Sequence, residues 1–354
     1  MIKILNCLPL LQEHNFKQKG IGISISIQLN ILIIKDIILV KFTPKIMNKL
    51  LLVDVGGTNL RYAYAYKGAK TISNSKKISL DSIEQFELLI GELLKNEDVD
   101  SLIISVAGPK VSGSISMTNR DLVISEEGLK ANFNLNSCYP LNDWESIGYS
   151  LANMEESEIE IIKKGKTFNK NSFFIGPGTG LGAALLVNNE HVLPTEIGNT
   201  TGLTKSLIKN YNLIDERDFI TLENAVSGSA ISKIYESKTG KRINSEQVIE
   251  LYRENDDAAK SVIDGFTKSL AEVMSDMALT FIAGNGVYVA GSLMRTITEL
   301  MDKEKFIEHF KGNKKGVHRD LLEMIPIGLI NREHACLIGN LNYFNIKENL
   351  NQEN

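Results

Sequence analysis

The spacing of apolar and polar positions predicts alternating strands and helices from residue 51 onward. Residues 51–55 are almost entirely apolar, and residues 61–66 alternate with period two and carry three tyrosines. Both patterns are typical of strands. Residues 81–94 place apolar side chains at helical spacing behind a polar cap, which indicates an amphipathic helix. Residues 101–107 form a short apolar run of the buried-strand type. This order favours an α/β layer.

A strand, a glycine-rich turn and a second strand occur twice in the chain. The first hairpin turns at Gly56. In the second, residues 172–175 precede a turn around Gly178, and residues 183–187 continue as an apolar run. Two such hairpins predict two related domains that face each other across a nucleotide.

Between the hairpins, residues 137–141 predict a strand that ends at Asn142 and Asp143. Open α/β sheets commonly place ligand-binding groups at the carboxyl ends of their strands. The pair also suits the cap of a helix over residues 144–151, and the two roles can coexist, one on each residue.

The last third of the chain predicts two helices around one strand. Residues 261–281 carry apolar side chains at helical spacing, as in a long helix that faces a core. Residues 286–290 predict a strand that stops at Gly291, where bare backbone can face a flat adenine ring. A helix around residues 336–343 is expected to pack back on the first domain.

The isoleucine-rich segment near the start, residues 21–42, does not predict a membrane span. Lys35 and Asp36 interrupt it, and the remaining apolar run is shorter than the roughly 20 residues that a spanning helix needs. It also lacks the compact apolar block and cleavage site of a signal peptide. We expect residues 1–46 to be a poorly packed extension, with the native start at Met47.

Composition narrows the class of protein without naming a reaction. The chain has 354 residues, of which 43% are hydrophobic and 23% charged, so it can bury a core and form two domains. A net charge of -4 without a dense basic tract argues against nucleic-acid binding. Three widely spaced cysteines form no metal-ligand pattern and leave one unpaired in any disulfide scheme, which favours a reducing cytoplasm.

The first turn carries residues suited to a phosphate and a metal ion. Adjacent glycines, Gly56 and Gly57, let backbone N–H groups approach a phosphate, and Thr58 adds a hydroxyl group. Asp54 at the strand end can hold magnesium, directly or through water. A strand follows the turn, whereas Rossmann and Walker loops lead into a helix. An ordinary hairpin turn explains the glycines but leaves Asp54 unexplained, so the pattern favours phosphoryl transfer from a nucleotide.

Seven ordered motifs resemble the bacterial glucokinase family, within the sugar kinases that share the actin-like, ribonuclease-H-like ATPase fold. The resemblance covers residues 47–345. It rests on Asp54-Val-Gly-Gly-Thr-Asn59, Met117-Thr-Asn119, Asn142-Asp143, Gly178-Thr-Gly-Leu-Gly182, Leu193-Pro-Thr-Glu196, Glu223-Asn-Ala-Val-Ser-Gly228 and Gly286-Val-Tyr-Val-Ala-Gly291.

The resemblance implies an α/β fold of two domains with the active site in the cleft between them. The small domain would comprise residues 47–153 and 334–354, and the large domain residues 154–333. The implied activity is ATP-dependent phosphorylation of glucose at the 6-hydroxyl group, feeding glycolysis in the cytoplasm. ATP and Mg²⁺ would be its cofactors, no nucleic acid or membrane would be a partner, and a homodimer stays open.

The resemblance also implies a role for individual residues. Asp143 would be the general base, and Asp54 would hold Mg²⁺ through water. The sugar would be bound by Asn119, Asn142, Asp143, Glu196, Asn199 and Glu223. The nucleotide would be bound by Val53, Asp54, Val55, Gly56, Gly57, Thr58, Gly178, Thr179, Gly180 and Gly291.

One position departs from the family pattern. After the first sugar-binding glutamate the family has Gly-Gly-His, whereas this chain has Ile-Gly-Asn between Glu196 and Thr200. Asn199 still donates and accepts hydrogen bonds, but it is shorter than histidine and does not titrate. A pocket that hydrogen-bonds each hydroxyl group discriminates by leaving buried partners unpaired, so the preferred hexose stays open.

Two alternatives to a glucose kinase follow. The closer one is a kinase for mannose, fructose or an amino sugar. The other is a sugar-sensing regulator that has kept the fold and lost catalysis. Such a regulator needs a DNA-binding module, and residues 1–46 show no paired amphipathic helices of the helix-turn-helix type.

Overall fold

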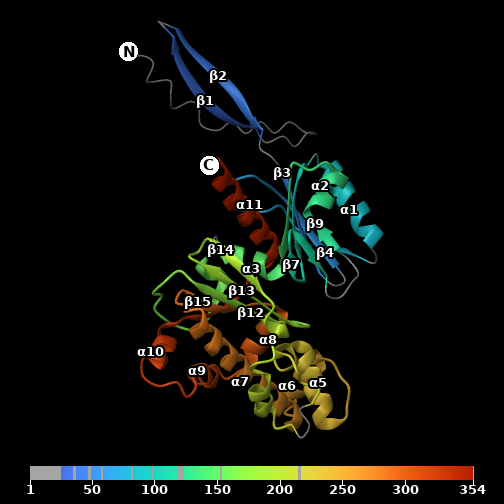
Figure 1. Cartoon of the computed structure of the whole chain (residues 1–354), viewed down its shortest axis with the longest axis vertical. Coiled ribbons are helices and arrows are strands. Elements are labelled where there is room, and N and C mark those ends of the chain that lie inside the picture. Colours follow the sequence, from blue (N-terminus) through green and yellow to red (C-terminus); the bar gives the residue numbers. More distant parts are fainter. Residues whose placement is uncertain are drawn as a thin grey trace. The chain divides into compact units, whose positions relative to one another are not determined.

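The computed structural model describes residues 25–34, 37–46, 49–56, 59–80, 83–97, 99–117, 123–151, 154–213 and 217–353. Contacts divide the chain into two compact units, residues 1–48 and residues 49–354. In the first unit, strands β1 (Ile25–Ile34) and β2 (Ile37–Ile46) pair antiparallel. The second unit holds the elements labelled from β3 onward in Figure 1.

A five-stranded sheet forms the first half of the second unit. Its strands in spatial order are β10 (Ser137–Asn142), β6 (Ser101–Val106), β3 (Lys49–Val55), β4 (Asn59–Tyr66) and β5 (Lys76–Ser79). The strands β10, β6 and β3 run parallel, whereas β4 is antiparallel to both of its neighbours. Helix α1 (Ile83–Asn96) buries Phe86, Ile90 and Leu93 in a core with this sheet, which confirms the predicted amphipathic helix.

A six-stranded sheet forms the second half. Its strands in spatial order are β11 (Ile159–Lys163), β16 (Ile327–Ile330), β15 (Gly286–Val289), β12 (Ser172–Pro177), β13 (Leu181–Val187) and β14 (His191–Thr195). Five of these strands repeat the topology of the first sheet. In each sheet an antiparallel hairpin lies centrally, a third antiparallel strand extends it, and two parallel strands follow on the other side. The predicted repetition of the hairpin is confirmed.

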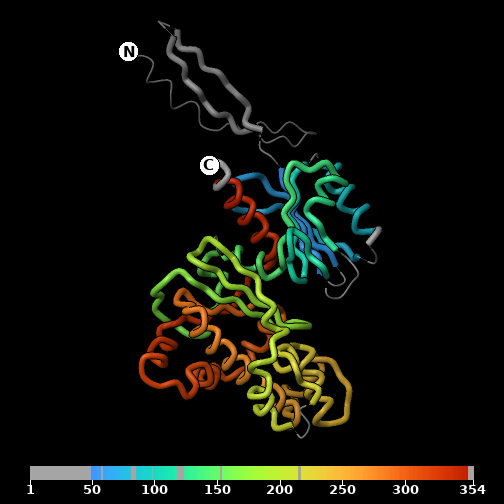
Figure 2. Tube along the Cα trace, viewed as in Figure 1, coloured from blue at the N-terminus to red at the C-terminus, as the bar shows by residue number. Residues whose placement is uncertain are grey.

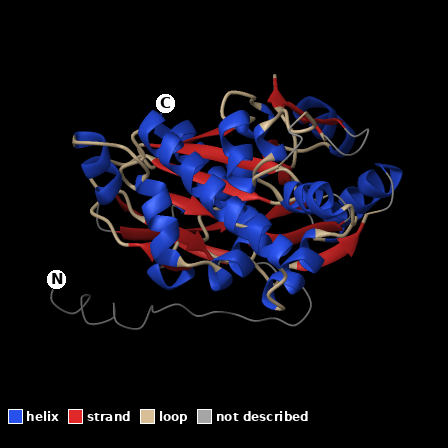
Figure 3. Cartoon of the chain, turned by 90° about the horizontal axis from the view of Figure 1, so that it is seen from below, coloured by secondary structure: helices blue, strands red, loops and turns tan. Residues whose placement is uncertain are grey.

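Helices accompany both sheets, and Figure 3 shows them covering the strands. Those between β14 and β16 are α4 (Thr204–Ile208), α5 (Gly228–Thr239), α6 (Ser245–Arg253), α7 (Asp257–Thr280), α8 (Ser292–Leu300), α9 (Lys303–Lys311) and α10 (Val317–Met324). The long helix α7 confirms the predicted one. Its side chains Val262, Phe266 and Leu270 are fully buried in the core of the second half.

Helices α3 (Asp143–Ser150) and α11 (Ala335–Glu353) cross between the halves. Helix α3 follows β10 of the first sheet and packs on β13 and β14 of the second, whereas α11 follows β16 of the second sheet and packs on β3 and β6 of the first. The two helices also pack on each other. Figure 2 shows the red trace of α11 beside the blue strands, far apart in the sequence. The predicted packing of the final helix is confirmed.

Short elements complete the second unit. After β6 the chain forms β7 (Lys110–Val111), β8 (Ser114–Ser116) and β9 (Val123–Ser125), and α2 (Glu126–Phe133) then leads to β10. Among the residues that the structure describes, no helix has the length and apolar character needed to cross a membrane.

Candidate active site

A cavity of about 780 Å³ is lined by the ends of elements from both sheets. Its walls include the loop after β6, the junction of β10 and α3, the turn between β12 and β13, and the end of β15. The short helical turns η4 (Ile197–Asn199) and η6 (Leu222–Asn224) and the start of α5 complete it. The predicted residues that line it are Asn142, Asp143, Gly178, Thr179, Gly180, Glu196, Asn199, Glu223 and Gly291.

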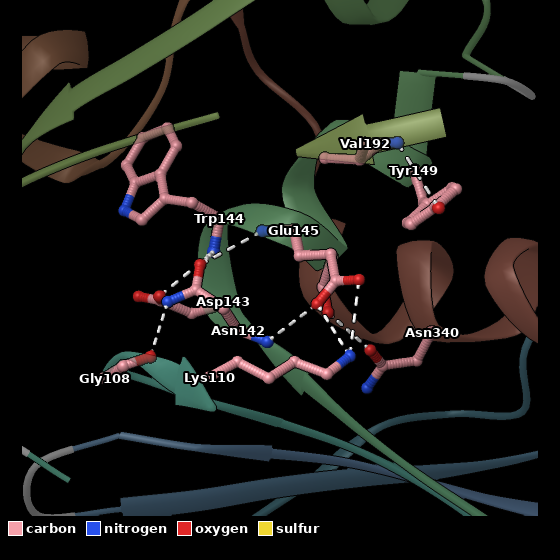
Figure 4. Close-up of polar contacts among 10 residues, drawn as sticks. Gly108, Lys110, Asn142, Asp143, Trp144, Glu145, Tyr149, Val192 and Asn340 are labelled. Atoms are coloured by element: carbon pink, nitrogen blue, oxygen red, sulfur yellow. Dashed lines mark hydrogen bonds and ion pairs between the residues drawn. The ribbon is translucent and has the colours of Figure 1, made fainter. Parts of the chain in front are cut away.

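Asn142 ends β10 and caps α3, as Figure 4 shows. Its Oδ1 accepts hydrogen bonds from the N–H groups of Trp144 at 2.9 Å and Glu145 at 3.2 Å. Glu145 in turn accepts one from the N–H group of Asn142 at 3.2 Å. The Asn142 Nδ2 donates to the carbonyl oxygen of Gly108 at 2.9 Å. This capping box fixes the first turn of α3 and leaves the neighbouring carboxylate for the cavity.

Asp143 is the first residue of α3, and its carboxyl group is unusually basic. Burial raises its pKa to about 7, and the negative charge of Asp54 adds to the rise. The N–H group of Trp144, which donates to Asp143 Oδ1 at 3.0 Å, opposes it. A carboxyl group with a pKa near the working pH is suited to general acid and base catalysis.

Two further carboxylates lie close together in the same cavity. Burial raises the pKa of Glu196, the charge of Glu223 adds to this rise, and a hydrogen bond from the Asn199 side chain opposes it. A Cβ on Gly180 would lie 2.7 Å from Glu223 Oε2, so this carboxylate sits directly beside the glycine turn. Carboxylates accept hydrogen bonds from neighbouring hydroxyl groups, which suits a polyhydroxylated ligand.

The turn between β12 and β13 lies against the start of α5. The N–H group of Gly178 donates to the carbonyl oxygen of Gly180 at 2.8 Å, which closes the turn. The N–H group of Gly228, the first residue of α5, donates to the carbonyl oxygen of Gly178 at 2.7 Å. The positive end of the α5 helix dipole favours anions. Together with Thr179 and Gly291, this wall of the cavity is suited to phosphate groups.

Asp54 on β3 lies outside the lining of the cavity. Its carboxylate is 3.3 Å from Arg61 Nη1 and 3.2 Å from Ser105 Oγ, and the Cys336 thiol also hydrogen-bonds to it. Burial raises the pKa of this carboxyl group, whereas the charge of Arg61 opposes the rise. Its charge reaches Asp143, so the two carboxylates are near each other.

The hydrogen bonds around Asp54 leave its carboxylate able to bind a magnesium ion through water. Among the described residues, no group of three or more His, Cys, Asp or Glu side chains could hold a metal. Mg²⁺ is usually bound through one or two carboxylates and keeps several waters. A carboxylate has about four acceptor positions, so three donors leave Asp54 with capacity for a metal-bound water.

The remaining predicted residues are Val53, Val55, Gly56, Gly57, Thr58 and Asn119. Val53 and Val55 point into the core with at most 1% of their surface exposed, so only their backbone can face a ligand. The N–H group of Gly56 donates to the carbonyl oxygen of Asn59 at 2.9 Å and closes the hairpin. Three predicted residues lie outside the described residues, namely Gly57, Thr58 and Asn119.

Trp144 lines the cavity but was not predicted as a site residue. Its indole ring packs on Gly176 and Gly182, which pair across β12 and β13. A Cβ on Gly182 would lie 1.7 Å from Trp144 Nε1, and one on Gly176 would lie 2.2 Å from Cη2. Gly182 thus makes room for the indole ring that follows Asp143. A signal was present, because this residue is the chain's one tryptophan and directly follows Asn-Asp.

Other lining residues gave no signal in the sequence. They include Ser229 and Lys233. Lys233 is a lysine on a helix, which ordinarily marks a solvated face. Its Nζ donates to the carbonyl oxygen of Asp218 at 2.9 Å and lies over the Phe219 ring.

Taken together, the cavity combines an anion-binding turn, a carboxyl group with a pKa near 7 and a pair of carboxylates suited to hydroxyl groups. A model of the glucokinase family matches residues 51–346 of this chain. The chain belongs to the glucokinase family. Membership makes it a sugar kinase, and this family uses ATP.

Individual relatives match across most of the chain. A glucokinase from Saccharophagus degradans is 25% identical over 319 residues, which covers 82% of this chain and 96% of that protein. A glucokinase from Nitrobacter hamburgensis is 29% identical over 307 residues, with 81% and 94% covered.

Solved structures of sugar kinases share the fold. The structure of a glucokinase from an Antarctic psychrotroph has a TM-score of 0.69 at 24% identity and covers 84% of this chain and 98% of that one. A ROK hexokinase from Thermus thermophilus has a TM-score of 0.62 at 15% identity, with 85% and 99% covered. Together with the repeated sheets, these matches show the two-domain α/β fold of the ribonuclease-H-like, actin-like ATPases.

Proposed function

We propose that this member of the glucokinase family transfers the γ-phosphate of ATP to the 6-hydroxyl group of D-glucose. One observation carries the proposal. A single cavity joins the basic carboxyl group of Asp143 to the glycine turn at Gly178 on one side and to Glu196 and Glu223 on the other. A glucokinase of the same fold from Balamuthia mandrillaris, 16% identical with a TM-score of 0.66, was solved in complex with glucose.

In the proposed reaction Asp143 accepts the proton of the sugar 6-hydroxyl group while the hydroxyl oxygen attacks the γ-phosphorus of ATP. The bond from this phosphorus to the bridging oxygen breaks, and ADP leaves. The capped first turn of α3 holds this carboxylate in place, and the amides around Gly178 and the start of α5 hold the phosphates. Phosphoryl transfer depends mainly on in-line positioning and on neutralising the phosphate charge. A magnesium ion bound through water at Asp54 would supply part of that neutralisation.

Sugar recognition is proposed for the other wall of the cavity. Glu196 and Glu223 accept hydrogen bonds from neighbouring sugar hydroxyl groups, and Asn199 contributes an amide group. Asn142 contributes the second hydrogen of its Nδ2, whose first is donated to Gly108. Asn119 keeps its proposed role at the sugar. Since a pocket of this kind rejects a sugar whose hydroxyl groups leave a buried partner unpaired, these residues would set the preference among hexoses.

A coupled assay of ADP release tests the kinase proposal directly. With magnesium, ATP and glucose, the full chain should show turnover, whereas Asp143→Ala should lose at least about 100-fold in kcat. Glucose affinity of the variant, measured by calorimetry, should change far less. No turnover of the full chain on glucose or on any other hexose of a broad panel would refute the kinase assignment.

A second candidate is a kinase for another hexose, such as mannose, fructose or an amino sugar. The Asn199 side chain already hydrogen-bonds to Glu196, so it presents a different set of free donors to the sugar than a histidine would. Comparing kcat/KM across these hexoses for the full chain and Asn199→His decides between them. If glucose is the preferred substrate of the full chain, the second candidate is wrong.

A further inference from the structure

Helices α3 and α11 touch at their backbones. A Cβ on Gly339 of α11 would lie 1.7 Å from the carbonyl oxygen of Ser146 on α3. Contact this close is available only to glycine, because the side chain of any other residue would overlap the carbonyl oxygen. The residue that follows Gly339 lies at the same crossing.

Asn340 is fully buried at the crossing and is bonded in two directions. Its Nδ2 donates to the carbonyl oxygen of Val53 on β3 at 2.8 Å, and its Oδ1 accepts from Ser146 Oγ on α3 at 2.7 Å. Figure 4 shows this side chain on α11 facing α3. A single amide group therefore joins the strand that carries Asp54 to the helix that carries Asp143.

Two further contacts reinforce the connection. Ser105 Oγ lies 3.2 Å from Asp54 Oδ1 and 3.3 Å from Asn340 Nδ2, so it bridges the amide and the carboxylate. One helical turn before Asn340, Cys336 Sγ lies 3.8 Å from the carbonyl oxygen of Asp143 and within hydrogen-bonding reach of Asp54. Through Cys336 and Asn340, α11 therefore contacts the Asp54 side chain, the Asp143 backbone, and the neighbouring residues Val53 and Ser146.

We propose that Asn340 is a positioning residue for phosphoryl transfer, which sets the distance between Asp54 on β3 and Asp143 on α3. The inference rests on the proposed kinase function. Asparagine suits the role because the site needs a donor toward Val53 and an acceptor toward Ser146 in one short side chain. An apolar residue would remove both bonds. The carbonyl oxygen of Val53 would keep only the bond from Ser105 Oγ at 3.2 Å, the Ser146 hydroxyl group would lose its acceptor, and no side chain of α11 would join β3 to α3 at this point.

The test compares two buried asparagines of the same helix. Asn342 is 2% exposed, and its Nδ2 donates to the carbonyl oxygen of Tyr149 on α3 at 2.9 Å. Asn340→Leu removes the connection to β3, whereas Asn342→Leu is the matched control that weakens the packing of α11 on α3. For each variant the measurements are the melting temperature, glucose affinity by calorimetry, kcat, and the ratio of glucose phosphorylation to ATP hydrolysis.

We expect Asn340→Leu to lose about 10- to 100-fold in kcat, because misplacement by about 1 Å can cost that much. Glucose affinity should change far less than kcat, because Glu196, Asn199 and Glu223 lie on elements that Asn340 does not contact. The ratio of phosphorylation to hydrolysis should fall, because a badly placed base leaves water to compete. Asn342→Leu should lower the melting temperature and keep the ratio, since loss of folded molecules reduces both reactions equally.

Ser146→Ala provides a milder variant should Asn340→Leu fold poorly. It removes only the bond to α3, so we expect the ratio to fall in the same direction. The double variant with Ser146→Ala and Asn340→Leu should show the same ratio of phosphorylation to hydrolysis as Asn340→Leu alone. The inference is overturned if Ser146→Ala keeps the ratio of the full chain, or if Asn340→Leu behaves as Asn342→Leu does. A full chain without kinase activity would instead refute the proposed function.

Discussion

Asn142 and Asp143 are neighbours in the chain, yet the structure separates their tasks. The amide caps α3 and holds the loop after β6, whereas the carboxylate faces the cavity with a pKa of about 7. The pattern predicted that a cap and a site residue could coexist here. The start of α3 assigns the two roles: Asn142 at the capping position bonds to backbone N–H groups of the helix, whereas the side chain of Asp143, the next residue, is free to face the cavity.

The raised pKa of Asp143 predicts a cost in stability at high pH. Its value is about 7 when folded against an ordinary 3.8, so the unfolded chain binds fewer protons between these values. Stability therefore falls as pH rises through this window and stays lower above it. We expect Asp143→Asn, which cannot ionise, to melt at least about 2 °C above the parent chain at pH 8.

The same calorimetric comparison at pH 5 supplies the control. There the folded carboxyl group keeps its proton, so the gain of Asp143→Asn should shrink. Equal melting temperatures of the two proteins at pH 8 would contradict the assigned cause.

Trp144 directly follows Asp143, the proposed base, and packs on Gly176 and Gly182, which flank the turn at Gly178. A substitution at Gly182 tests whether this packing matters for activity. Gly182→Ala should push the indole ring out of place and lower kcat/KM by about 10-fold or more. Gly202→Ala is the control, because a Cβ on Gly202 would meet nothing within 4 Å. The single tryptophan also reports its surroundings by fluorescence. Unchanged emission and unchanged kcat/KM in Gly182→Ala would show that the ring is not held by this glycine.

Among the elements, α10 has an unusual end. The carbonyl groups at its C-terminal end accept hydrogen bonds from Lys163, a residue of β11 that is only 4% exposed. The Lys163 Nζ donates to the carbonyl oxygens of Glu323 at 2.5 Å, Ile325 at 2.9 Å and Lys164 at 3.2 Å. A positive charge at a helix C-terminus stabilises the carbonyl groups that lack partners within the helix.

Lys163→Met should therefore lower the free energy of unfolding by about 2–4 kcal/mol, because three carbonyl groups, that of the buried Ile325 among them, lose a charged donor. Denaturation by urea measures the change. The neighbouring Lys164 is exposed, so Lys164→Met should change the same quantity by less than about 0.5 kcal/mol. Similar losses in both variants would mean that burial of Lys163 contributes little.

At the scale of the whole molecule, two sheets of one topology are joined by helices that each pack on the other sheet. We propose that residues 47–153 with 334–354, and residues 154–333, act as domains around the cavity. Binding of the sugar should close them, which would exclude water and limit hydrolysis of ATP. Small-angle X-ray scattering should give a smaller radius of gyration with glucose than without it. An unchanged radius, with glucose binding shown by calorimetry, would argue against closure.

The first unit, residues 1–48, offers a separate prediction. Contacts divide it from the remainder of the chain. A chain that begins at Met47 should keep both kcat and melting temperature. A loss in either quantity would show that the preceding residues stabilise the kinase.

Local patterns sufficed for much of the fold and for most of the candidate site. The periods of strands and helices are read over a few residues, so β3, β4, α1, β12, β13 and α7 follow from spacing alone. Glycine turns and carboxylates at strand ends were equally visible. Lys233 and Ser229 were not, because a polar residue on a helix looks the same whether it faces water or a ligand.

Local patterns in the sequence specify the helices and strands and the chemical groups at their ends. The packing of distant elements then sets which of these ends come together. Trp144 meets Gly182, and Asn340 meets Ser146, because α3 and α11 cross between the sheets. The basicity of Asp143 was decided there too. Burial and the charge of Asp54 raise its pKa, and both exist only once distant strands have packed around it.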